Sequence, residues 1–233
     1  MKRILNAVLN VLFPHHCFLC NTVLSPHQRL CADCIRNAPY VLPPVCELCG
    51  RGEEHCICGG HRRDFRRCVS PFYHVGVARD SILQYKQLNY TVAAEGFAAE
   101  MAEVVRREYG GIPFDVVTSV PLHKKDLHLR GFDQAAGLAQ ILAKRLDLPY
   151  EPLLTKLERT EPQKELSLLL RRGNLLGVFD VIGDVTDRTV LLVDDVITTG
   201  STLNECAKML KIFGAAEVYA VTAAAAVLKK DDT

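Results

Sequence analysis

The residues with the clearest capacity for chemistry lie in one run, residues 194–202. Two adjacent carboxylates, Asp194 and Asp195, follow an apolar segment and could accept hydrogen bonds from neighbouring hydroxyls of a ribose. The residues after them turn at a glycine and lead into a helical pattern, so backbone N–H groups and a helix dipole would face an anion. This pattern predicts a sugar-phosphate site whose phosphate-binding residues are Thr198, Thr199, Gly200, Ser201 and Thr202.

The plainer alternative for this run is a solvated turn, in which the two acids face water and Ser201 only caps a helix. Acids, glycine and hydroxyls coincide here at a junction between a strand pattern and a helix pattern. Crevices at such junctions are where open α/β sheets bind ligands. The coincidence therefore favours the binding site over the solvated turn.

A second group with capacity for chemistry is the cysteines, because nine of the ten lie between Cys17 and Cys68. Eight of these form four close pairs, three spaced C-x2-C and one spaced C-x-C, which is typical of zinc ligation. Metal-bound thiols indicate a reducing compartment, so we expect a cytoplasmic protein. The simplest assignment is two structural zinc sites, formed by Cys17, Cys20, Cys31 and Cys34 and by Cys46, Cys49, Cys56 and Cys58.

Other zinc assignments remain open at this stage. The pairs could interleave, and His55, His61 or Cys68 could replace a ligand of the second site, where the C-x-C spacing is short. Cys206 falls on the apolar face of a predicted helix and is expected in the core. Zinc is expected to stabilise a small module that is short of apolar residues.

The elements that must position these residues alternate between strand and helix. Residues 114–120 and 189–193 read as buried strands, and each is followed by a helical pattern, the second of which stops at Gly214. A last strand covers residues 218–224, and residues 156–179 read as a functional loop. The pattern predicts an α/β fold with a mostly parallel sheet and helices on both faces. We expect two units, residues 1–68 with the cysteines and residues 69–233 with the sheet.

Composition limits the partners of the chain as a whole. Its 28 basic and 27 acidic residues give a formal net charge of +1, so no general attraction to nucleic acid or anionic membranes is built in. The first 14 residues imitate a signal peptide but lack a small-residue cleavage site, and they predict an amphipathic helix. That helix is too short to span a bilayer, so no membrane span is expected.

Residues 190–202 resemble the motif by which type I phosphoribosyltransferases bind phosphoribosyl pyrophosphate (PRPP). The resemblance extends through nearly the whole chain to the ComF family, including its N-terminal double zinc ribbon. It implies a type I phosphoribosyltransferase fold, PRPP and Mg²⁺ as ligands, and a role in natural transformation. It also implies that Asp194 and Asp195 hold the ribose 2′ and 3′ hydroxyls, and that residues 198–202 hold the 5′-phosphate.

Further segments carry the same resemblance. Residues 119–125 look like the pyrophosphate loop, and residues 130–134 look like the R-G-F-N-Q segment, although Asp133 replaces the usual Asn and cannot donate as an amide does. Residues 159–174 resemble the flexible loop that closes over the substrate. The resemblance thus adds these ligand-binding residues: Ser119, Val120, Pro121, Lys124, Lys125, Arg171 and, more weakly, Lys86.

Two functions follow from these observations. The first is transfer of the phosphoribosyl group to a nitrogen base that the sequence does not identify, or hydrolysis or exchange of that group. In this function Asp194 and Asp195 orient the sugar, and Lys124, Lys125 and Arg171 bind pyrophosphate. The second is a PRPP sensor whose zinc ribbon contacts single-stranded DNA or a partner in DNA uptake, such as a helicase. Basic runs at residues 61–67, with Phe65, and 123–130 support the second function.

Overall fold

The computed structural model describes residues 14–26, 28–56, 58–59, 62–88, 91–122, 127, 131–157 and 178–227. The predicted N-terminal helix and the segment expected to close over the substrate, which includes Arg171, lie outside these residues. So do His61, Lys124 and Lys125.

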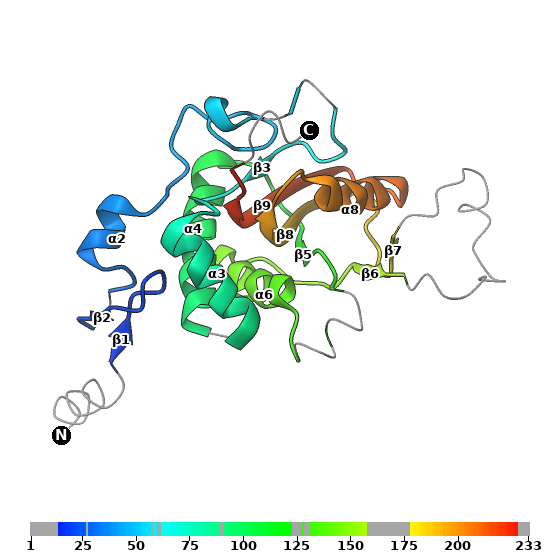
Figure 1. Ribbon diagram of the computed structural model, residues 1–233. Coiled ribbons are helices and arrows are strands. Elements are labelled where there is room, and N and C mark those ends of the chain that lie inside the picture. Colours follow the sequence, from blue (N-terminus) through cyan, green and yellow to red (C-terminus); the bar gives the residue numbers. More distant parts are fainter. Residues whose placement is uncertain are drawn as a thin grey trace.

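The centre of the described chain is a five-stranded sheet in which all pairings are parallel (Figure 1). The spatial order is β3-β9-β8-β5, and β4 pairs with the same edge of β9 as β3 does. This parallel sheet is the one that the sequence predicts. The strands are β3 (Cys68–Val69), β4 (Phe72–Tyr73), β5 (Val116–Ser119), β8 (Thr189–Ile197) and β9 (Glu217–Ala225).

Strand β8 divides the core into two halves, because successive side chains of a strand point to opposite faces. Leu191 and Val193 lie in the core half that is shared with helices α4 (Thr91–Glu108) and α6 (Gln134–Leu146). Val190 and Leu192 lie in the other half, against helix α8 (Ser201–Ile212). Helix α3 (Gly76–Leu88) packs beside α4, so helices cover both faces as predicted (Figure 1).

A short antiparallel ribbon stands at the two ends of the predicted functional loop. It pairs β6 (Leu154–Lys156) with β7 (Phe179–Val181), and Lys156 lies opposite Phe179 in its register. The outer residues of the predicted loop are therefore strand residues.

The cysteine-rich segment contains β1 (His15–His16), β2 (Val23–Leu24), α2 (Ala32–Asn37) and a 3-10 turn, η1 (Glu53–His55). Its Phe18 is buried against α4, where a Cβ added at Gly96 would lie 2.1 Å from the phenyl ring. Only glycine permits this close approach. Residues on both sides of position 68 therefore share one core, and the unit boundary at that position stays a prediction.

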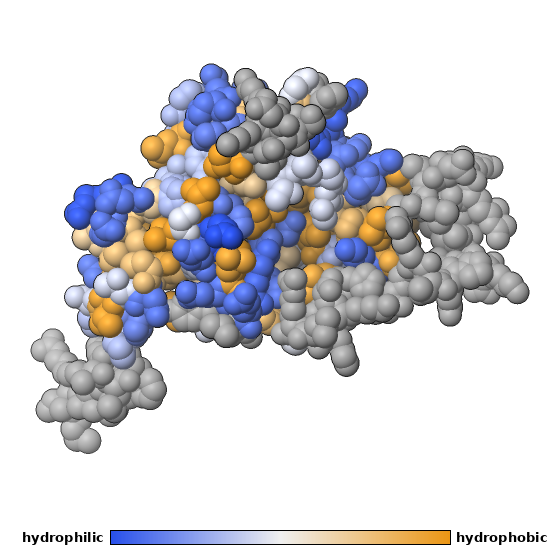
Figure 2. Space-filling model, viewed as in Figure 1, coloured by the Kyte–Doolittle hydropathy of each residue, from blue (hydrophilic) through white to orange (hydrophobic). Residues whose placement is uncertain are grey.

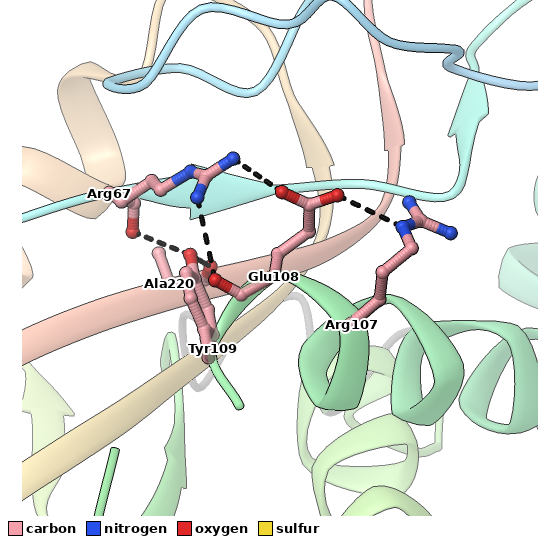
Figure 3. Close-up of polar contacts among 5 residues, drawn as sticks. All are labelled: Arg67, Arg107, Glu108, Tyr109 and Ala220. Carbon is pink, nitrogen blue, oxygen red and sulfur yellow. Dashed lines mark hydrogen bonds and ion pairs between the residues drawn. The ribbon is translucent and has the colours of Figure 1, made fainter. Parts of the chain in front are cut away.

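Polar contacts join Arg67, where the cysteine-rich segment meets the sheet, to the end of α4 and to β9 (Figure 3). The Arg67 guanidinium donates to Glu108 at the end of α4, with Nη2 2.6 Å from Oε2. The Tyr109 hydroxyl lies 2.9 Å from the Arg67 carbonyl and 2.8 Å from the Ala220 carbonyl. These contacts hold the start of β3 against both α4 and β9.

Hydrophilic and hydrophobic residues are interleaved over the described part of the face seen in Figure 2. In the described part of the chain, no helix combines the length and hydropathy needed to cross a membrane.

Candidate functional site

The acid pair lies where the carboxyl ends of β5 and β8 meet. These strands are in register with Ser119 opposite Val193, so Asp194 is the next residue along β8. The strand is longer than predicted, since it continues through both acids to Ile197 and pairs with β9. The Asp195 N–H donates to the Asp194 carboxylate at 2.8 Å. The two acids are therefore joined to each other by this contact, and Asp194 also pairs with Thr222 of β9.

Asp195 points to the side covered by α3, and there Lys86 Nζ lies 2.7 Å from Asp195 Oδ2. Lys86, a weaker candidate from sequence, thus contacts the acid pair. Burial raises the pKa of Asp194 well above its ordinary value, and the negative charge of Asp195 adds to that rise. The Asp195 N–H and Lys86 act in the opposite direction.

The hydroxyl-rich residues after β8 form an accessible turn. Gly200 has φ +79°, a left-handed conformation that favours glycine, and it occupies the N-cap position of α8 with no side-chain cap. Ser201 is the first residue of the helix, so the alternative in which Ser201 serves as its cap is wrong. The side chains of Thr199 and Ser201 lie 2.8 Å apart through their hydroxyl oxygens. The exposed residues of this turn are Thr198, Thr199, Ser201 and Thr202.

The segment after β5 lies beside the acid pair and is held by side chains. The Ser119 hydroxyl is 3.2 Å from that of Tyr150, while the buried Val120 donates its N–H to the Val193 carbonyl at 2.9 Å. Pro121, which follows, is half-buried. Val120 therefore uses both its side chain and its N–H within the fold.

Asp133 acts here as an acceptor, which is the role that a carboxylate can fill. Its Oδ1 accepts from the Ala136 N–H at 2.9 Å as the N-cap of α6. Its Oδ2 accepts from the Leu122 N–H at 3.1 Å. Asp133 therefore ties the segment after β5 to the start of α6.

The structure adds His74, which sequence reasoning missed. It directly follows β4, and its buried Nε2 has no hydrogen-bond partner among the described residues. Burial lowers the pKa of His74, and the positive charge of Lys86 lowers it further against the opposing effect of Asp195. The surroundings of His74 therefore favour its neutral form, and Lys86 and Asp195 are among the charges that act on it. Its only sequence signal is its place just after an apolar strand.

Two arginines contact the backbone of the hydroxyl-rich turn, a role that the sequence did not predict for either. Arg51 and Arg63 belong to the cysteine-rich segment, yet both donate to backbone carbonyls of residues 197–199. Arg63 was noted only as part of the basic run at residues 61–67. Arg51 follows the pair Cys46–Cys49, where an arginine is typical of a solvated charge, so no local pattern marks its contact.

The eight paired cysteines form two clusters in chain order. In each cluster the four sulfur atoms lie within 4.8 Å of one another. The Cys20–Cys31 sulfur separation is 3.6 Å and the Cys46–Cys58 separation is 4.0 Å. A tetrahedral zinc with bonds of about 2.3 Å requires sulfur separations of about 3.8 Å, so both clusters fit the metal. The interleaved pairing is wrong.

The thiols of the first cluster differ in acidity. Burial raises the pKa of Cys34, and the neighbouring cysteines raise it further. Burial opposes ionisation of Cys20 as well, but its hydrogen bonds with Thr22 and with the other cysteines of the cluster outweigh burial and lower its pKa to about 6. Zinc binding must therefore displace protons from the more buried thiols.

The alternative zinc ligands among the described residues lie elsewhere. Cys68 is fully buried in β3, and its thiol contacts the Val69 carbonyl. His55 packs edge-on against Tyr73, with ring centres 5.0 Å apart. Cys206 is buried in α8, as expected. Phe65, expected to support DNA binding, is only 2% exposed and packs in the core, so it cannot stack on a base.

Comparison with known proteins places both parts of the chain. Residues 133–232 match the model of the phosphoribosyl transferase domain, and residues 8–69 match that of the double zinc ribbon domain. The DNA utilization protein YhgH of Salmonella typhi is 33% identical over 224 residues, which cover 88% of this chain and 94% of that protein. Competence protein F of Haemophilus influenzae is 39% identical over 108 residues, 45% of this chain and 47% of that protein.

Among solved structures, the glutamine PRPP amidotransferase from B. subtilis is 21% identical with a TM-score of 0.42. The match covers 60% of this chain but only 30% of that enzyme. The family therefore rests on the domain models and on the match to YhgH along nearly its full length. The chain belongs to the ComF/YhgH-like family, in which a type I phosphoribosyltransferase fold is joined to an N-terminal double zinc ribbon.

Proposed function

We propose that this protein binds PRPP together with Mg²⁺ and transfers its phosphoribosyl group to a nitrogen nucleophile. One observation carries the proposal: the acid pair of β8 and the exposed hydroxyl turn at Gly200 stand at a single strand-to-helix junction. The spacing suits one ligand that carries both ribose hydroxyls and a phosphate.

The described residues would act by orienting the sugar. Asp194 and Asp195 accept hydrogen bonds from the ribose hydroxyls, and residues 198–202 donate to the 5′-phosphate through N–H and hydroxyl groups. The bond from the anomeric carbon to pyrophosphate breaks with its electron pair leaving on oxygen, and the nucleophile's nitrogen forms the new bond and loses a proton. Positive charge that grows on the ribose ring is stabilised by the nearby carboxylates. When bound, Mg²⁺ would neutralise part of the negative charge of the pyrophosphate.

The pyrophosphate itself is assigned to Lys124, Lys125 and Arg171. These residues lie outside the described part of the chain, so their assignment rests on the resemblance of residues 119–125 and 159–174 to the family segments. Lys86, 2.7 Å from Asp195, supplies a further positive charge at the site.

A second candidate function is a PRPP sensor that also binds single-stranded DNA. The observation in its favour is a cavity of about 800 Å³ beside the second cysteine cluster. Its lining includes four basic residues, Arg62, Arg63, Arg66 and Lys211, and three acidic ones, Glu47, Asp64 and Glu217. Relatives named for DNA utilization and competence agree with this reading. The buried Phe65 contributes nothing to it. We place either function in the cytoplasm, where thiol ligands stay reduced.

Titration calorimetry separates the two functions. PRPP with Mg²⁺ and single-stranded DNA are each titrated into the intact chain and into the variant Asp194→Asn/Asp195→Asn. Arg36→Met, on the exposed face of α2, serves as control. If the intact protein ignores PRPP, the proposed function is wrong. If PRPP binds only to intact protein and control, but no panel of nitrogen bases consumes it, the sensor is favoured over the transferase.

A further inference from the structure

Arg51, which follows Cys49 and Gly50 of the second cysteine cluster, is buried with 1% of its surface exposed. It contacts the backbone at the start of residues 197–202, which we call the phosphate turn. Its Nε donates to the Ala226 carbonyl at 2.9 Å, and its Nη2 donates to the Ile197 carbonyl at 3.0 Å and to the Thr198 carbonyl. Arginine is seldom fully buried unless its charge is compensated. Here the compensation comes from three backbone carbonyls at the ends of β8 and β9.

A second arginine extends the same contact by one residue. Arg63 Nη2 donates to the Thr199 carbonyl at 3.0 Å. The carbonyls of residues 197, 198 and 199 thus all accept from arginines of the cysteine-rich segment. In a planar trans peptide the N–H points opposite to the C=O, so the N–H groups of residues 198–200 point away from these arginines. That is the direction from which an anion would approach the turn.

The backbone of Arg51 is part of the second cysteine cluster. The Cys46 N–H donates to the Arg51 carbonyl at 2.7 Å, and the Gly50 N–H donates to the Cys46 carbonyl at 2.9 Å. Gly50 has φ +67°, and a Cβ there would lie 2.3 Å from the Cys68 carbonyl oxygen. The turn that holds Cys46 and Cys49 therefore packs closely against β3. The side chain of Arg51, the residue after Gly50, reaches the phosphate turn.

We infer that Arg51 is a positioning residue, through which the second cysteine cluster holds the phosphate turn in the shape that presents its N–H groups to a 5′-phosphate. The inference rests on the proposed function in taking a 5′-phosphate as the ligand. The contact between Arg51 and the turn does not depend on that function. It makes the second ribbon a part of the binding site rather than a separate structural cap. A guanidinium suits this role because its planar fork reaches carbonyls on two sides at once, which an ammonium group does not.

The test compares Arg51→Met and Arg51→Lys with the control Arg36→Met in the full-length zinc-loaded protein. Arg36 is exposed in the last turn of α2. Three quantities are measured: zinc content, amide hydrogen exchange without ligand, and the Kd of ribose 5-phosphate. Arg51→Met should keep two zinc ions and should exchange faster in residues 197–203 only. Its Kd should rise about 10- to 100-fold, the loss expected for charge-assisted hydrogen bonds.

Arg51→Lys should recover part of both effects, because it keeps the charge and some donors, and Arg36→Met should match wild type. Unchanged exchange in residues 197–203 of Arg51→Met would overturn the inference. Faster exchange throughout the sheet would also overturn it, because that would indicate a general loss of stability. If wild type binds no sugar phosphate, the proposed function fails, while the exchange comparison still decides whether Arg51 holds the turn. Should Arg51→Met not fold, Arg51→Lys supplies the same comparison.

Discussion

Lys86 of α3 lies with its ammonium nitrogen 2.7 Å from Asp195 Oδ2 at the end of β8. The two side chains are 28% and 15% exposed, so the pair is shielded more than an ordinary surface ion pair. The contact joins residues that are more than a hundred positions apart, and it offsets negative charge where two carboxylates stand side by side. Lys86 thus offsets part of the negative charge of the acid pair in β8.

Lys86→Met should weaken binding of PRPP with Mg²⁺ by about 10- to 100-fold. Removing the ammonium leaves Asp195 unpaired beside Asp194 and takes one positive charge from a site for a polyanion. Calorimetric Kd values give the measurement, and Lys144→Met, exposed on α6, is the matched control. Equal affinity of Lys86→Met and wild type would show that the ammonium does not serve the ligand.

Asp194→Asn should abolish PRPP binding but make the protein more stable at neutral pH. The wild-type carboxylate is desolvated beside another charge, and a neutral amide of similar size avoids that cost. We expect a gain of about 1 kcal/mol, or about 2–4 °C in Tm for a chain of this size. Thermal unfolding checks the shift, and an unchanged or lower Tm would contradict it.

The same group predicts how stability depends on pH. Because the pKa of Asp194 is higher in the folded than in the unfolded protein, the folded state binds more protons, and stability falls as pH rises above the unfolded pKa. The stability advantage of Asp194→Asn over wild type should therefore grow as pH rises from 5 to 8. Urea unfolding at both pH values measures it, and a constant difference would refute the assignment.

Each cysteine cluster should hold one zinc ion. Metal analysis should find two zinc ions in wild type and one each in Cys31→Ser and Cys56→Ser, which affect the first and second cluster. Zinc should be released more readily as pH falls, because protons compete for the thiolates. Stoichiometry of one in wild type, or loss of both ions in Cys31→Ser, would contradict two separate sites.

Asp133→Ala should lower the free energy of unfolding by about 1–3 kcal/mol, because it removes a helix cap and the acceptor of the Leu122 N–H. Asp133→Asn keeps one oxygen acceptor and should cost about half as much. Urea unfolding measures both, with Asp80→Ala on the exposed side of α3 as control. An equal loss in both variants would show that the Leu122 contact adds nothing.

The sequence alone determined the features that depend on residues close together in the chain. The alternation of apolar strands and helices predicted the parallel sheet, because periodicity reflects burial within each segment. The run of acids, glycine and hydroxyls at residues 194–202 and the spacing within each cysteine pair are visible in the sequence, because each involves only neighbours in the chain. The structure decided how the cysteine pairs combine. Local pattern failed in two cases that depend on packing: the end of β8, which pairing with β9 extends to Ile197, and Phe65, which the core buries.

Only the tertiary structure decided which distant side chains meet at the site. Arg51 reaches the carbonyls of residues 197 and 198, and Lys86 reaches Asp195 from another helix. Asp133 is fixed as an acceptor by two backbone N–H groups, and His74 is placed near the acids by the pairing of β4 with β9. A charged side chain looks the same in sequence whether water or a buried carbonyl surrounds it, and only the packed fold distinguishes the two.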